Sequence, residues 1–133
     1  MMSGLNHKCL FIRDVLSVTP SDQDRKCQVS VCGVVVDIVR PNLDLHSNRP
    51  LIISLDDGTG VVKCVIFMFV NLPHLQNLQL GQCCLVRGSV NVYNNQIQIK
   101  CQQVKIVNDV NFETLWINKV LFEKKQIEKK EQL

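Results

Sequence analysis

This 133-residue sequence has few aromatic residues, little excess of one charge and no long uninterrupted apolar run. The longest apolar run, 61–70, is interrupted by Lys63, whereas a membrane span takes about 20 residues. The start of the chain lacks the basic region, continuous apolar stretch and small-residue cleavage site of a secretory signal. We therefore expect no membrane segment and no secretion, and a protein of the cytosol or nucleus.

Signatures of catalysis and metal binding are also missing. None of the seven cysteines belongs to a Cys-x-x-Cys pair, which argues against a zinc site. His7, His46 and His74 stand in separate segments, and no Gly-x-x-x-x-Gly-Lys phosphate loop occurs. The odd number of scattered cysteines favours free thiols in a reducing compartment. We expect no catalytic residue, no metal, no cofactor and no small-molecule substrate.

The composition that remains is that of one globular domain. Hydrophobic residues make up 46% and charged residues 20% of the chain, and its length suits a single core. The formal charge of +3 permits binding to nucleic acid without arguing for it. Aromatic residues make up only 5%, so few side chains are available to stack on bases.

Alternating apolar residues predict a long first strand over 27–40. Its apolar positions change phase at Cys32 and Gly33, which indicates a bulge or a glycine bend in one strand. The inward positions expected after the bend are Val34, Val36 and Ile38. Long bent strands of this kind are typical of small barrels.

Two short strands and a capping segment follow. Leu51, Ile53 and Leu55 mark the inner face of the second strand, and Asp57-Gly58 forms a turn into a third strand over 59–68. The leucine-containing segment 70–80 predicts a short helix or helical turn. Gly81 is expected to end it.

The fourth strand, 83–93, has the clearest alternation in the chain. Asn94-Asn95 is expected to form a turn, because Asn tolerates left-handed backbone angles. In the fifth strand a second phase change at Gln102-Gln103 predicts a second bulge, which turns Val104 and Ile106 inward. The segment 5–19 is too short and too dense in apolar residues to assign, and 20–26 reads as a connection.

A helix is predicted from Asp109 or Asn111 onward, since both are good caps. Its apolar arc is too wide for one surface, which favours contact with a partner over chance scatter. The boundaries we expect are an N-terminal segment and connection at 1–26, a barrel at 27–108 and a partner-binding helix at 109–133. The helix residues predicted to bind the partner are Phe112, Leu115, Trp116, Ile117, Val120 and Leu121.

Five strands with a bent first strand, a capping segment after the third and a bulged last strand describe the OB-fold. Five strings sharpen that pattern and together resemble the middle subunit of replication protein A and the Stn-type subunit of the CST telomere-capping complex. The similarity extends over roughly 9–122. The strings are CLFIRDVL at 9–16, CGVVVDI at 32–38, LDDGTGVVKCVIF at 55–67, LGQCCLVRGSVNVY at 80–93 and VNDVNFETLW at 107–116.

The resemblance implies a mainly β protein, a five-stranded Greek-key OB-fold barrel with a C-terminal α-helix. It further implies a non-enzymatic subunit that assembles with other OB-fold subunits through this helix, binds single-stranded DNA weakly and acts in the nucleus at chromosome ends. The alternative is an OB module for protein interaction alone, without DNA binding, as in the OB-fold subunits of dissolvasome complexes.

Residues for DNA contact follow from the alternation and from the resemblance. Phe67 and Tyr93 match aromatic stacking positions of the family, and nearby basic residues would hold phosphates. The competing interpretation packs Phe67 under 70–80, lays Tyr93 over the barrel rim and leaves the charges in solvent. The full predicted set is Phe67, Tyr93, Lys63, Arg87, Arg40, Arg49 and Lys100.

Overall fold

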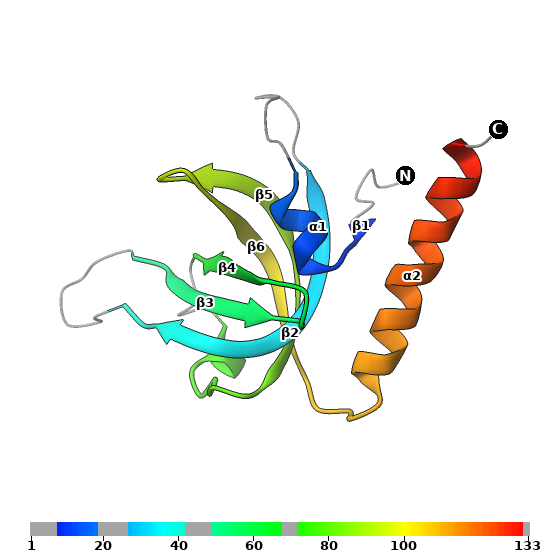
Figure 1. Ribbon diagram of the computed structural model, residues 1–133. Helices are drawn as coiled ribbons and strands as arrows, with labels where there is room; N and C mark the ends of the chain where they lie inside the picture. The colour runs from blue at the N-terminus through cyan, green and yellow to red at the C-terminus, as the bar shows by residue number, and fades with distance from the viewer. Residues whose placement is uncertain (1–7, 19–26, 42–48, 68–71, 132–133) are drawn as a thin grey trace, which may run out of the picture.

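The computed structural model of the chain describes residues 8–18, 27–41, 49–67 and 72–131 (Figure 1). No helix within those ranges has the length and hydrophobicity needed to cross a membrane. The elements in chain order are β1 (Lys8–Cys9), α1 (Ile12–Leu16), β2 (Gln28–Val39), β3 (Leu51–Asp56), β4 (Val61–Ile66), the 3-10 turn η3 (Pro73–Leu75), β5 (Cys83–Tyr93), β6 (Gln96–Val107) and α2 (Phe112–Glu131).

Five of the strands close into a barrel. The sheet runs β2–β3–β4–β6–β5, and β5 pairs again with β2. The β4–β6 pair is parallel, and the other pairs around the barrel are antiparallel. Closure leaves the barrel strands without an open edge except along the first part of β2, which β3 does not reach. The predicted OB-fold barrel followed by a C-terminal helix is confirmed, with α2 standing beside the barrel in Figure 1.

The alternation predicted for β3 to β6 places the core correctly. Leu51, Ile53 and Leu55 have no exposed surface, and the alternate residues of β4 and β5 join the same cluster. The described part of the capping segment is a single 3-10 turn, from which Leu75 contributes to that core; 68–71 lie outside the described residues. From the N-terminal side, Ile12 of α1 enters the core as well.

The bend in β2 lies further along the strand than predicted. The register against β3 shifts between Val35 and Asp37, so Val35 is buried and Val36 is 46% exposed. The expectation that Val34 and Val36 point into the barrel was therefore wrong, although Ile38 does pack against the core.

Gly33 has a different role from the one its position suggested. A Cβ atom at this residue would lie 3.0 Å from the carbonyl oxygen of Asp56. The glycine therefore permits the close approach of β2 and β3. The phase change that the pattern assigned to Gly33 comes three residues later.

The second predicted bulge is confirmed. Arg87 pairs with Gln103 and Gly88 pairs with Cys101, so Gln102 is the extra residue on β6. A Cβ atom at Gly88 would lie 2.2 Å from the carbonyl oxygen of Lys100. No larger residue fits there without displacing backbone.

The N-terminal segment that the sequence left unassigned forms β1 and α1. β1 pairs with β2 in parallel, with Cys9 opposite Ser30. On that side, β3 pairs with β2 only from Val34 onward, so β1 covers part of an edge that β3 leaves open. α1 is then fixed to the β3–β4 turn, because Asp57 Oδ2 accepts a hydrogen bond from the Ile12 amide at 2.8 Å.

α2 packs on the outside of the barrel through a second, smaller cluster. Trp116 and Val120 are buried there against Cys9 and Cys32. The Phe112 ring stacks on Trp116 with the ring centroids 6.4 Å apart. This cluster is separate from the barrel interior, so the helix is attached through its own seam.

Candidate nucleic-acid and partner interfaces

Three of the predicted DNA residues lie on one part of the outer surface of the barrel. Lys100 pairs in register with Val65 of β4, and its Nζ lies 5.5 Å from the centroid of the Phe67 ring. Lys63 lies in register with Gln98 of β6. We call this surface, made of Lys63, Phe67, Gln98 and Lys100, the β4–β6 face.

The β4–β6 face offers both chemistries that single-stranded nucleic acid requires. Phe67 is 46% exposed, so its ring is available for stacking, and the Lys100 ammonium lies over it. Lys100 over the Phe67 ring is a cation–π contact, which orients both side chains. Strands two and three of an OB-fold, here β3 and β4, form the usual ligand surface of this architecture.

Tyr93 stands at the far end of that surface. It pairs with Gln96 next to the β5–β6 turn, where Asn94 and Asn95 have φ angles of 52° and 62°, as predicted for this turn. Gln96 and Lys100 are four residues apart on β6, which is about 13 Å along a strand. Tyr93 and Phe67 therefore border the face and do not touch each other.

The predicted arginines are not brought to this face. The Arg40 guanidinium donates to the carbonyl oxygens of Gln76 and Leu78, which fixes the capping segment to the end of β2. Arg87 pairs with Ser30, the residue that also faces β1, and so lies on the α2 side of the barrel. Arg49 is exposed beside 42–48, which lie outside the described residues.

The six predicted partner-binding residues of α2 separate into two groups. Trp116 and Val120 are buried in the chain's own seam, and Phe112 packs against it. These three anchor the helix to its own barrel, and their contact with a partner stays a prediction. The other three, Leu115, Ile117 and Leu121, are exposed.

Phe122 and Ile127 are exposed apolar residues of α2 that the predicted partner-binding set did not include. Phe122 is 62% exposed and follows Leu115 by seven residues, so both lie on one stripe of the helix. The spacing was visible in the sequence, but the predicted partner-binding set ended at Leu121. We call Leu115, Leu121 and Phe122 the outer face of α2.

Two thiols meet beneath the helix seam. The Sγ atoms of Cys32 and Cys83 lie 3.4 Å apart, and this hydrogen bond lowers the pKa of Cys83 and raises the pKa of Cys32. Burial raises the pKa of the neighbouring Cys84 to about 12. No group of His, Cys, Asp or Glu within the described ranges has the arrangement of a metal site.

The chain is similar in structure to proteins of several kinds. A chain of the S. pombe Stn1–Ten1 complex matches with 17% identity and a TM-score of 0.77, covering 90% of this chain and 92% of that one. A chain of a replication protein A heterotrimer bound to single-stranded DNA matches with 17% identity and a TM-score of 0.72, covering 89% and 94%. A chain from yeast Stn1 and Ten1 matches with 16% identity and a TM-score of 0.71, covering 90% and 73%.

An enzyme domain shares the architecture too. In asparaginyl-tRNA synthetase from Pyrococcus horikoshii, 23% of the chain matches 76% of this one, with 16% identity and a TM-score of 0.58. At these identities the likenesses show the fold alone, and no curated protein matches the sequence. The family model described as OB-fold nucleic acid binding domain matches residues 29–107. Because this match spans more than half of the chain, the protein belongs to the family of OB-fold nucleic-acid-binding domains.

Proposed function

We propose that the protein is a non-enzymatic OB-fold subunit of a replication protein A-like or telomere-capping complex. The observation that carries the proposal is the contact of the Lys100 ammonium with the exposed Phe67 ring, on a surface that also carries Lys63. Under this proposal the protein acts in the nucleus at chromosome ends. It assembles with other OB-fold subunits through α2 and contributes a modest contact to single-stranded DNA.

The proposed DNA contact is weak because its parts are few. Each stacked base is worth about 1–3 kcal/mol, and the β4–β6 face offers Phe67 with Tyr93 at its border. Two lysines neutralise few phosphates, so the affinity depends only weakly on salt. The logarithm of the binding constant should fall against the logarithm of the salt concentration with a slope near −1.4, at about −0.7 per phosphate contact. We expect a strand to run along β6 from Tyr93 toward Phe67.

The DNA contact is tested by fluorescence anisotropy with a labelled oligothymidylate at low salt. We expect the double variant Phe67→Ala with Tyr93→Ala to bind at least about tenfold more weakly, the loss of one stacked base or more. Lys105→Ala is the matched control, since Lys105 is an exposed lysine of β6 that pairs with Leu85, away from the β4–β6 face. Unchanged binding by the double variant would remove the β4–β6 face from the proposal.

The proposed assembly surface is the outer face of α2. Leu115 and Phe122 expose 61% and 62% of their surface, and an apolar stripe of this kind suits a helix from another subunit. Burying two such side chains contributes about 3–6 kcal/mol. The exposed Leu121 widens the same surface.

Assembly is tested on the tagged full chain purified with its natural partner, which mass spectrometry identifies. Leu115→Lys with Phe122→Lys should release that partner while circular dichroism of the free chain stays the same. Lys125→Ala serves as the control, because it changes an exposed position of the same helix without introducing charge. A partner that stays bound to the double lysine variant would place the assembly surface elsewhere.

The second candidate is an OB module for protein interaction alone. It is favoured by Arg40, which binds carbonyl oxygens of its own chain. The same anisotropy titration separates the two candidates. No binding of the wild-type chain at low salt, together with retained partner assembly, would establish the second.

A further inference from the structure

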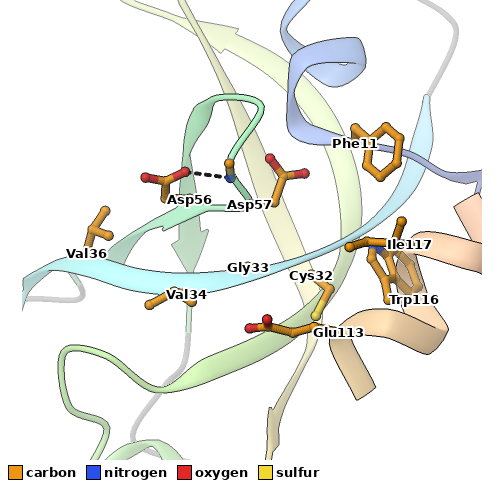
Figure 2. A pocket seen from close by; sticks show the side chains of 11 residues that line it. Phe11, Cys32, Gly33, Val34, Val36, Asp56, Asp57, Glu113, Trp116 and Ile117 are labelled. Atoms are coloured by element: carbon orange, nitrogen blue, oxygen red, sulfur yellow. Dashed lines mark hydrogen bonds between the residues drawn. The ribbon is translucent and has the colours of Figure 1, made fainter. Parts of the chain in front are cut away.

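A groove of about 350 Å³ separates the N-terminal half of α2 from β2 and the β3–β4 turn (Figure 2). We call it the α2 groove. Its walls are largely apolar, and Val36 on the β2 side and Ile117 on the helix side are each 46% exposed. The apolar lining consists of Phe11, Val34, Val36, Trp116 and Ile117.

The α2 groove lies beside a stretch of β2 that has no strand neighbour on that side among the described residues. β1 reaches only to Ser30, and β3 pairs from Val34 onward. The Ser30 carbonyl accepts a hydrogen bond from Leu10 on this side, so the alternation of the backbone turns the peptide groups of Cys32 the same way. An extended chain in the groove would meet that peptide edge.

The rim of the α2 groove carries negative charge within a chain of formal charge +3. Three carboxylates line it and no Lys, Arg or His does. Asp57 is held by the Ile12 amide and by Thr59. Asp56 Oδ1 accepts from the Gly58 amide, and Glu113 is exposed in the first turn of α2. Cationic groups are favoured there, and nucleic-acid phosphates are repelled.

We propose that the α2 groove binds a short extended peptide of a partner protein that carries an apolar side chain two residues away from a Lys or Arg. The apolar side chain packs on the helix-side wall formed by Trp116 and Ile117, and the cation reaches one of the rim carboxylates, Glu113 or Asp56. Alternate residues of an extended peptide are about 6.6 Å apart and point to the same side, so an apolar side chain and a cation can enter the groove together. Shallow pockets beside a strand edge are a recurring way to recognise peptides.

This site is independent of the proposed function. The α2 groove shares no residue with the β4–β6 face or with the outer face of α2. Loss of DNA binding or of subunit assembly would therefore leave it intact, and loss of peptide binding would leave both of those intact.

The test uses the full ¹⁵N-labelled chain and three capped eight-residue peptides, in which two leucines alternate, at every second position, with two lysines, two glutamines or two glutamates. The reporter is the indole N–H of Trp116, the one tryptophan of the sequence. Trp116 lines the groove, and its Nε1 has no hydrogen-bond partner among the described residues. We expect the lysine peptide to shift this resonance most, the glutamine peptide less and the glutamate peptide least.

Charge variants measure the contribution of the rim carboxylates to peptide binding separately from that of the apolar walls. Glu113→Gln with Asp56→Asn should weaken the lysine peptide about threefold to tenfold, as expected for two exposed ion pairs, and leave the glutamine peptide unchanged. If the double variant fails to fold, Glu113→Gln alone should weaken the lysine peptide in the same direction. Glu128→Gln is the matched control, because it removes an exposed carboxylate of α2 that does not line the groove.

Wall variants complete the test. Val36→Lys and Ile117→Lys should each abolish the indole shift by filling the groove with a cation. The proposal is overturned if the lysine peptide leaves the indole unshifted at millimolar concentration, if the glutamate peptide binds equally well, or if both lysine variants keep wild-type affinity. An indole shift caused by oligothymidylate would overturn it too and would assign the groove to nucleic acid.

Discussion

Val120→Ala tests whether α2 is held by a seam that is separate from the barrel core. Val120 is 1% exposed and packs with Trp116, Cys9 and Cys32, whereas the barrel interior forms another cluster. Shortening Val120 should therefore loosen the helix and leave the five barrel strands paired. Local release of this kind is expected when an element has few buried contacts of its own.

The size of the effect follows from the two carbon atoms removed. Each buried carbon is worth about 0.8 kcal/mol, and the cavity left behind adds to the loss. We expect release of α2 to become easier by about 2 kcal/mol. Because release of α2 exposes less surface than global unfolding, its m-value lies below about 2 kcal/mol per molar urea, and the midpoint of the release falls by about 1 M or more.

Trp116 supplies the assay, because it is the single tryptophan and is only 6% exposed within the seam. The red shift of its fluorescence should have a lower urea midpoint than the loss of the strand signal in circular dichroism. Val120→Ala should increase the difference between these two midpoints. Leu121→Ala, at the next position but 43% exposed, should change the free energy by no more than about 0.5 kcal/mol. Equal losses in the two variants, or coincident transitions in both, would refute a separate seam.

Three further outcomes follow from particular contacts. Gly88→Ala should lower the free energy of unfolding in urea by about 3 kcal/mol or more, because its Cβ would lie 2.2 Å from the Lys100 carbonyl oxygen; a wild-type midpoint would contradict this. Asp57→Ala should lower the melting temperature, since it leaves the α1 amide it binds without an acceptor, a loss of about 1–3 kcal/mol. Iodoacetamide at pH 8, followed by mass spectrometry, should label Cys83 before Cys84, because the pKa of Cys83 is lowered and that of Cys84 is raised to about 12; equal rates would contradict it.

The barrel could be predicted from the sequence because alternation reports burial directly. Leu51, Ile53 and Leu55 occupy every second position of β3, and all three are buried on its inner side. The extra residue Gln102 was visible because one added residue reverses every later side chain. The β5–β6 turn followed from two asparagines that adopt positive φ angles.

The position of the β2 bulge and the strand β1 could not be predicted, because both depend on pairing with another strand. Val34, Val35 and Val36 are consecutive valines, so the sequence holds no contrast that locates the bulge. Its position is set by the register with β3. β1 could not be predicted for the same reason, since its two residues form a strand only by pairing with the open edge of β2.

α2 has an anchoring side and an exposed side, and the predicted partner residues are divided between them. A wide apolar arc indicates two contacts but does not say which belongs to the chain itself. The structure answers this through Trp116, which packs toward β1 and β2, while Leu115 and Phe122 remain exposed. α2 and the β4–β6 face involve different strands of the barrel. A change at Lys100 should therefore affect nucleic-acid binding without loosening the helix, and a change at Phe122 should affect assembly without altering the contact between Lys100 and Phe67.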